Sequence, residues 1–243
     1  MRKLLAISGA LLVCSSVLGA QSGTAAVLST DNIYAAAGNA ALGSFGGGGG
    51  TAPVSIGLNA GTGRVLSLTS AATGSWTCTF GGDLSGPDGG PCAGPNTNID
   101  ALNKISGYKA TNTMTLVGLF LGASLPGSAP ATLDFTGAGA ESFCGMSGLS
   151  LGQVFFIGDG RGFANCTQQF FVPDAATQFY FGVADAFGFT GTPGFYDDNS
   201  GTVSASYSIS SVSTVPEPST TALLAAGMAA LVMAGRRRQR RQT

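Results

Sequence analysis

The C-terminal segment places the strongest constraint on what this chain can be. Residues 219–235 form an apolar run of 17 residues without a charged side chain, at the short end of the roughly 17–25 residues that span a bilayer core. A basic cluster follows directly, made of Arg236, Arg237, Arg238, Arg240 and Arg241. Because basic residues beside a membrane segment stay on the cytoplasmic side, everything before residue 215 is expected outside the cytoplasm.

A proline-rich triplet precedes the apolar run. Proline lacks a backbone donor and fixes φ, so Pro216 and Pro218 keep a helix from extending upstream. The order of triplet, apolar helix and arginine cluster resembles the PEP-CTERM sorting signal of Gram-negative bacteria. That resemblance implies recognition and processing of residues 213–243 by an exosortase, a membrane cysteine peptidase, in organisms that produce exopolysaccharide. The signal then comprises Pro216, Glu217, Pro218, Arg236, Arg237 and Arg238. A plain C-terminal membrane anchor is the alternative.

The N-terminus has the features of a secretory signal peptide. Arg2 and Lys3 precede an apolar stretch at residues 4–18, and small residues follow, which is the pattern that directs a chain to the Sec translocon. We expect cleavage after Ala20, with Ala26 as the second choice. An exported protein of about 195 residues remains between the two targeting segments, enough for one domain with a sizeable core.

The composition of that exported part excludes some partners. Charged residues make up 9% of the whole chain, far below the usual quarter, whereas the 44% of hydrophobic residues can still build a core. Four basic and eleven acidic residues fall between residues 21 and 215, a net charge of −7. No basic patch for nucleic acid is therefore expected, and an acidic surface favours cations.

Four cysteines lie in the exported part. An even number in an exported chain indicates disulfides, and three pairings are possible. We favour the two that close local loops. Zinc binding is the alternative, but the chain has no histidine and no Cys-x-x-Cys pair. The favoured bridges join Cys78 to Cys92 and Cys144 to Cys166.

Short strands punctuated by Gly, Pro, Asn and Asp predict an all-β fold. The clearest strand is residues 203–210, where Val, Ala, Tyr and Ile alternate with serines. Residues 113–121 are almost continuously apolar, which predicts a strand covered on both faces. Further strands are expected at residues 65–70, 75–80, 154–157 and 178–183. The pattern favours a β-sandwich over residues 53–212, preceded by a glycine-rich segment at residues 21–52.

One loop between the last two expected strands is rich in oxygen ligands. Residues 192–201 read Thr-Pro-Gly-Phe-Tyr-Asp-Asp-Asn-Ser-Gly. Two adjacent carboxylates, an amide oxygen and nearby main-chain carbonyls are the hard ligands that calcium prefers, and Asp185 at the end of the preceding strand adds another. The alternative is a plain turn, since Asp, Asn and Gly are common turn residues.

The order of segments around this loop resembles the end of calcium-dependent galactose-binding bacterial lectins. The resemblance is carried by residues 172–176, by Phe-Tyr-Phe-Gly-Val-Ala-Asp at 179–185 and by residues 193–201, with weaker similarity back to residue 53. It implies a galactose-binding-like jelly-roll β-sandwich. It also implies a calcium site in which the ligands are Asp185, Asp198, Asn199 and the carbonyl of Phe195, with a further carbonyl near Cys78.

The chain also departs from those lectins. Seven residues separate Asp185 from Pro193, a longer insertion than in the lectins. The lectins contact sugar through a His and a Gln after their Gly-Pro segment, and the corresponding residues 91–96 contain neither. Galactose specificity therefore does not carry over, whereas calcium binding is expected to.

Three classes of function remain. The first is a cell-surface or extracellular-matrix protein that binds polysaccharide, through calcium. The second is a structural or adhesive matrix protein whose calcium loop only rigidifies the fold. An enzyme is not expected, because the chain has no histidine as a general base and no Gly-x-Ser-x-Gly motif.

Overall fold

The computed structural model describes residues 20–38, 48–79, 82–90, 92, 94 and 96–211. All of them belong to the unit of the chain that ends at Ser211. Three sheets are formed and, in this part of the chain, no α-helix. Three short 3-10 helices are present, η1 (Ile33–Ala37), η2 (Phe163–Asn165) and η3 (Phe187–Phe189). The predicted all-β class is confirmed, and the jelly-roll topology stays a prediction.

The largest sheet has six strands organised by β14. Its order is β1 (Gln21–Leu28), β14 (Ser200–Ser211), β3 (Arg64–Leu68), β11 (Gln169–Phe171) and β9 (Gly145–Met146), and β4 (Thr73–Thr77) also pairs with β14. The alternation predicted for β14 is observed, because Val203, Ala205 and Ile209 are buried between more exposed residues. Each inward residue therefore faces the second layer of the sandwich.

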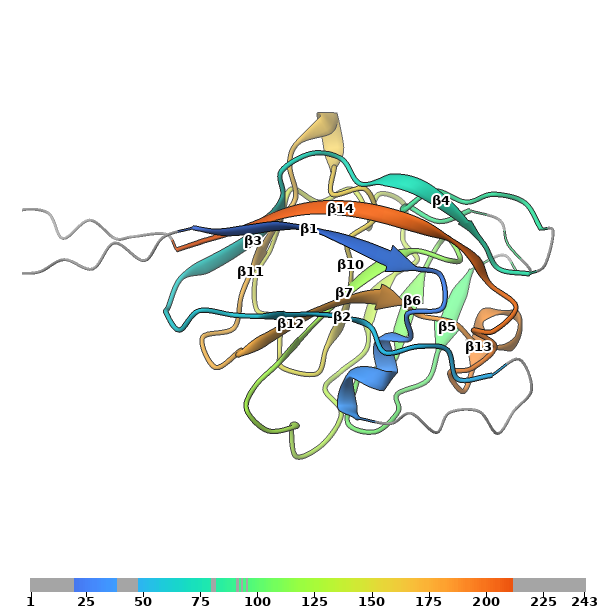
Figure 1. Ribbon diagram of the computed structural model, residues 1–243, viewed down its shortest axis with the longest axis horizontal. Coiled ribbons are helices and arrows are strands. Elements are labelled where there is room, and N and C mark those ends of the chain that lie inside the picture. The colour runs from blue at the N-terminus through green and yellow to red at the C-terminus, as the bar shows by residue number, and fades with distance from the viewer. Residues whose placement is uncertain are drawn as a thin grey trace, which may run out of the picture. The chain divides into compact units, whose positions relative to one another are not determined.

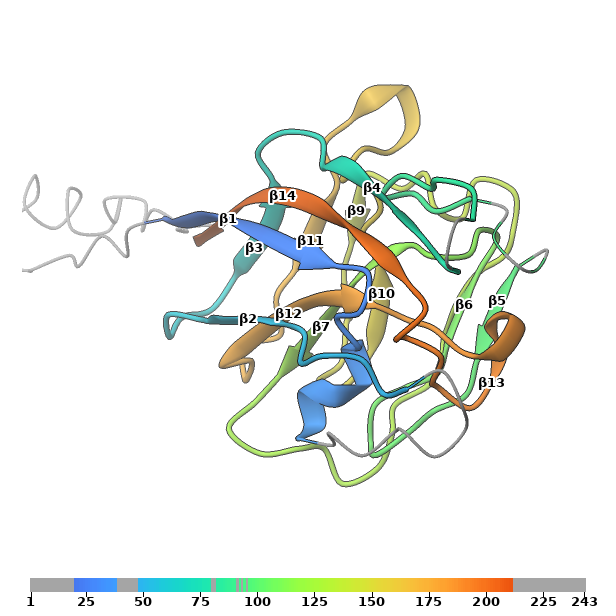
Figure 2. The ribbon, with the colours of Figure 1, turned by 45° about the vertical axis from the view of Figure 1, so that its right-hand side comes forward.

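The second layer is a four-stranded antiparallel sheet. Its order is β10 (Val154–Phe156), β7 (Leu116–Leu121), β12 (Gln178–Val183) and β2 (Val54–Gly57). All six residues of β7 are buried, as its continuous apolar sequence predicts. Gly118 in this strand leaves room for the neighbouring strand, because a Cβ there would lie 2.5 Å from the Phe155 ring. Figures 1 and 2 show β1 and β14 in one layer and β2, β7 and β12 in the other.

A third, smaller sheet lies at one end of the sandwich, on the right in Figure 1. It contains β13 (Thr190–Gly191), β5 (Thr97–Ile99), β6 (Tyr108–Ala110) and β8 (Leu133–Phe135). Aromatic side chains dominate the core between the layers. Phe120 packs against Phe155 and Phe179, with ring centroids 5.2 and 5.1 Å apart.

The sandwich begins earlier than residue 53. Strand β1 pairs with β14 along its whole length, from Gln21 opposite Ile209 to Leu28 opposite Thr202. Ala25 and Val27 point into the core. The segment at residues 21–52 was expected to precede the sandwich as a glycine-rich stretch. Its described part contributes the edge strand β1 and the helix η1. The physical reason is that small side chains on β1 give a weak apolar signal, although the ladder with β14 is complete.

Both predicted disulfides are present. Cys78 is bonded to Cys92 and Cys144 to Cys166. The first bridge is buried, with Cys78 8% and Cys92 4% exposed. The second ties the turn at η2 to the segment before β9, and Cys144 is exposed. Two local loops are therefore closed, as the spacing of the cysteines favours.

Candidate functional site

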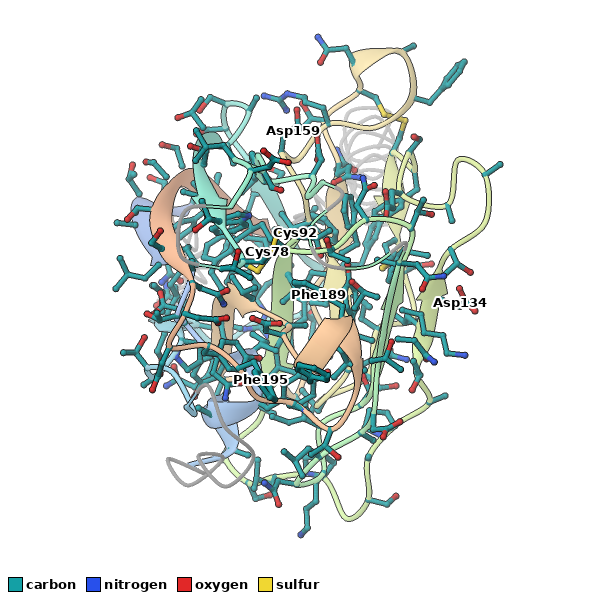
Figure 3. The ribbon with its side chains drawn as sticks, turned by 90° about the vertical axis from the view of Figure 1, so that its right-hand side faces the viewer. Cys78, Cys92, Asp134, Asp159, Phe189 and Phe195 are labelled. Atoms are coloured by element: carbon teal, nitrogen blue, oxygen red, sulfur yellow. A yellow bond between two sulfur atoms is a disulfide. The ribbon has the colours of Figure 1, made fainter. Side chains whose placement is uncertain are left out.

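A pocket of about 180 Å³ lies where β12 ends and β14 begins. It brings together three of the four predicted calcium ligands, Asp185, Phe195 and Asp198, which line it with Cys78 and Thr79. Figure 3 views this end of the sandwich, with the pocket-lining residues Cys78, Phe189 and Phe195 labelled. Segments more than a hundred residues apart in the sequence thus meet at one cavity.

Asp185 forms the floor of the pocket. It follows directly after β12 and is only 3% exposed. Its Oδ1 accepts a hydrogen bond from the main-chain N–H of Ala186 at 2.7 Å, and its Oδ2 accepts one from Asn199 Nδ2 at 2.6 Å. The hydroxyl of Tyr196 accepts from the Asp185 main-chain N–H at 3.0 Å. Burial raises the pKa of the Asp185 carboxyl group to about 8, although the hydrogen bonds from Asn199 and Ala186 lower it.

Asn199 links Asp185 to the opposite sheet. It is 5% exposed, and its Nδ2 also donates to the main-chain carbonyl of Ser29 at 3.2 Å. Its Oδ1 is buried and finds no hydrogen-bond donor among the described residues. An unpaired buried oxygen of this kind costs about 1–3 kcal/mol. The Asn199 amide nitrogen therefore donates two hydrogen bonds, whereas the amide oxygen accepts none from the described residues.

Asp198 also has a buried side-chain oxygen without a hydrogen-bond partner in the described chain. Its Oδ1 is buried and accepts no hydrogen bond from the part of the chain that the structure describes. Burial raises the pKa of Asp198, a hydrogen bond from its own main-chain N–H lowers it, and the charge of Asp197 raises it further. Asp198 in turn raises the pKa of Asp185. Two carboxyl groups thus act on each other at one pocket, where a cation would remove the repulsion.

The adjacent carboxylates of residues 197 and 198 diverge. Asp197 is exposed, and its Oδ1 accepts the main-chain N–H of Gly50 at 3.2 Å. It therefore holds the segment before β2 rather than the pocket. Of the two neighbouring acids in the predicted loop, only Asp198 lines the pocket.

The seven-residue insertion after Asp185 does not move that residue away from the pocket. An antiparallel bridge between Ala186 and Pro193 closes the insertion at its base. The main-chain N–H of Gly194 also donates to the Asp185 carbonyl at 3.0 Å. Between these points the chain forms η3 and β13, and β13 pairs with β5. The insertion thus builds one wall of the pocket.

That wall supplies residues that the sequence did not single out. Ala186, Phe187, Gly188 and Phe189 all line the pocket. Phe187 is 75% exposed, whereas Phe189 is 2% exposed and anchors the loop in the core. The only indication of these residues in the sequence is the length of the insertion. An extra loop beside a ligand residue commonly shapes the site that it borders.

Phe195 has the backbone geometry of a residue held in a special position. Its φ is +68°, a left-handed conformation that is unusual for a bulky side chain. In the described chain its carbonyl accepts no hydrogen bond. The role of that carbonyl as a calcium ligand stays a prediction.

The donor set fits calcium by its chemistry. Carboxylate, amide and carbonyl oxygens are hard ligands, and Ca²⁺ takes 6–8 of them. Among the described residues no three His, Cys, Asp or Glu side chains cluster as a metal site. The set here has two carboxylates, and neutral oxygens would have to supply the remaining calcium ligands. The two unpaired oxygens of Asp198 and Asn199 are of the required kind.

The predicted sorting signal lies outside the described residues. This holds for the Pro-Glu-Pro triplet, the apolar segment and the arginine cluster, and also for the expected signal peptide before residue 20. Within the described residues, no helix is long and apolar enough to cross a membrane.

Comparison with known proteins identifies one part of the chain. Residues 214–239 match the PEP-CTERM protein-sorting motif. No curated protein and no solved structure matches the chain. The motif includes all six residues expected to form the signal, from Pro216 to Arg238. The match therefore supports an exported protein that passes through the membrane-anchored state and is processed by an exosortase.

Proposed function

We propose that this protein is a cell-surface or extracellular-matrix protein whose sandwich binds carbohydrate, such as exopolysaccharide, through a calcium ion held in the pocket. Export and processing by an exosortase would deliver the domain to the place where such polysaccharides accumulate. The calcium ligands are Asp185, Asp198, Asn199 and the main-chain carbonyl of Phe195. Bound there, calcium would supply open coordination positions for sugar hydroxyls.

One observation carries this proposal. Two buried oxygens, Asp198 Oδ1 and Asn199 Oδ1, lack hydrogen-bond partners among the described residues. The Asn199 amide nitrogen donates to the buried carboxyl group of Asp185, and Asp198 lines the same pocket as Asp185. Hydrogen bonds normally satisfy buried oxygens. A cation coordinated by both oxygens would satisfy them and would also favour the ionised forms of Asp185 and Asp198. A plain turn does not require this arrangement.

Thermal unfolding tests the calcium half of the proposal. At free calcium 100 times the dissociation constant, binding stabilises a fold by about 2.7 kcal/mol, which corresponds to roughly 5–10 °C in Tm for a domain of this size. We expect this rise when millimolar calcium replaces chelator. The Asp198→Asn variant should lose most of it.

Asp134→Asn is the matched control. Asp134 lies on β8 and is exposed, and Figure 3 shows it away from Phe195. The substitution also removes one negative charge, so it should leave the calcium-induced rise unchanged. A Tm that does not respond to calcium in the unaltered protein would overturn the calcium site.

A glycan array tests the carbohydrate half. The protein should bind polysaccharide or its fragments in calcium and release them in chelator. If calcium raises Tm while no glycan is bound, the pocket serves only to rigidify the fold, and the protein is a structural or adhesive matrix component.

A further inference from the structure

The rim of the pocket exposes an aromatic ring. Phe187 is 75% exposed although it lines the cavity. Its ring lies against that of Phe195, with centroids 4.9 Å apart and planes inclined by 44°. The two rings thus form one apolar surface at the pocket that Asp185 and Asp198 also line.

The exposure of Phe187 is fixed by its loop. The buried ring of Phe189 holds the loop from below, and its N–H donates to the Ala186 carbonyl at 2.9 Å. On the far side, the N–H of Asp100 donates to the Gly191 carbonyl at 2.8 Å. Phe189 has a φ of +56°, a conformation that bulky residues adopt only where the surroundings impose it. The fold therefore presents Phe187 to solvent on a rigid support.

We propose that Phe187 and Phe195 form a stacking platform for the apolar face of a single neutral sugar ring. This inference rests on the proposed function, because the hydroxyl groups of that ring would face the calcium ion. Aromatic rings offer a large, rigid apolar surface at low entropic cost, and the C–H face of a pyranose is its apolar complement.

Volume and charge define the class of sugar. The pocket, at about 180 Å³, is smaller than the roughly 300–1,000 Å³ of sites that enclose drug-sized ligands. It suits one terminal ring rather than a longer segment of polysaccharide. The surrounding carboxylates and the net charge of −7 for residues 21–215 disfavour anionic sugars. The preferred ligand is therefore a neutral terminal pyranose with adjacent hydroxyl groups.

The test separates the platform from the calcium site. Binding of methyl pyranosides and of glucuronic acid would be measured by calorimetry in saturating calcium, for the unaltered protein and for Phe187→Ala. Removal of one stacking ring should cost about 0.5–1.5 kcal/mol of binding free energy, so the affinity for the neutral sugar should fall roughly 2- to 10-fold. Phe187→Tyr should restore it, because the ring is kept. Phe163→Ala is the control, since Phe163 is a similarly exposed ring, at 77%, on the 3-10 helix η2.

The rise of Tm in calcium alone is the second readout. It should be unchanged in Phe187→Ala, because no side-chain atom of Phe187 is a proposed ligand. Equal sugar affinity in Phe187→Ala and in the unaltered protein would overturn the platform and leave the proposed function standing. A preference for glucuronic acid over neutral pyranosides would overturn the assigned sugar class. Absence of sugar binding in the unaltered protein would overturn the carbohydrate half of the proposed function itself, and the platform with it.

Discussion

Asp185 makes the stability of the metal-free protein depend on pH. Burial raises its folded pKa from 3.8 to about 8, so the folded state holds this proton more tightly than the unfolded state does. The stabilisation of the folded state by this bound proton is complete below about pH 4 and is lost as the pH rises through about 8. Between these limits the free energy of unfolding should fall by about 1.4 kcal/mol per pH unit from this group. In chelator, denaturant unfolding at pH 5 and pH 7 measures that fall.

Asp185→Asn separates this group from the other titrating residues. The variant keeps the shape of the side chain but loses the proton equilibrium. Its stability should therefore decline less between pH 5 and pH 7, by about 2.7 kcal/mol relative to the unaltered protein. Equal declines in the two proteins would show that Asp185 does not titrate in this window.

At the scale of single residues, part of the candidate site could be predicted from the sequence. Asp185, Asp198 and Asn199 stand out because their side chains supply oxygens near one loop. Asp185 and Asp198 line one pocket, and Asn199 donates to Asp185. This arrangement depends on the bridge between Ala186 and Pro193, and no local pattern shows that contact. The exposure of Phe187 was beyond prediction for a similar reason, since an apolar ring is expected inside and only the anchoring of Phe189 turns it outward.

Individual elements were predictable where the apolar signal is long. Strands β7, β12 and β14 have at least six residues each, and their runs or alternations stand out from the turns. Strands β5, β6, β8, β9 and β13 have only two or three residues, too few for any periodicity to be recognised. These short strands form only because they pair with strands that are distant in the sequence or in separate segments of it. The sequence therefore indicated the sandwich and missed the third sheet that bears one wall of the pocket.

The two disulfides should differ in their resistance to reduction. Thiol–disulfide exchange requires access to a sulfur atom. Cys78 and Cys92 are buried, whereas Cys144 is exposed beside the turn at η2. Under native conditions dithiothreitol should therefore reduce the Cys144–Cys166 bridge first, which alkylation followed by peptide mapping would detect. Earlier labelling of Cys78 and Cys92 would contradict the burial of that bridge.

Loss of either bridge should destabilise the domain as a whole. The bridges join cysteines 14 and 22 residues apart in the sequence, and closing a loop of about 15 residues contributes roughly 3 kcal/mol in the chain-entropy model. The Cys78–Cys92 bridge has a second consequence, because Cys78 also lines the pocket. Its reduction should weaken calcium binding, whereas reduction of Cys144–Cys166 should not.

On the scale of the whole molecule, β14 connects the pocket with the last described residue. It begins at Ser200, next to Asn199, and ends at Ser211 after 12 residues. At about 3.3 Å per residue, its two ends are roughly 35–40 Å apart. In Figure 1 the first residue of β1 and the last residue of β14 lie together at the left, while β13, which follows the pocket-lining helix η3, lies at the right. The end of the domain that carries the pocket is thus remote from the residue where the chain continues towards the sorting motif.

Processing should remove the tail and leave the sandwich intact. The matched motif at residues 214–239 supports cleavage by an exosortase, and the mature protein should then lack the segment that follows the Pro-Glu-Pro triplet. Mass spectrometry of protein from the envelope and from the medium would measure this in a host that has an exosortase. Peptides from the disulfide-bonded sandwich should be abundant, and peptides from residues 219–241 absent. A host without the exosortase gene is the control and should retain the tail. Routine recovery of residues 219–241 in the mature protein of both hosts would leave the tail as a plain anchor, and the pocket would then act at the membrane surface rather than in the matrix.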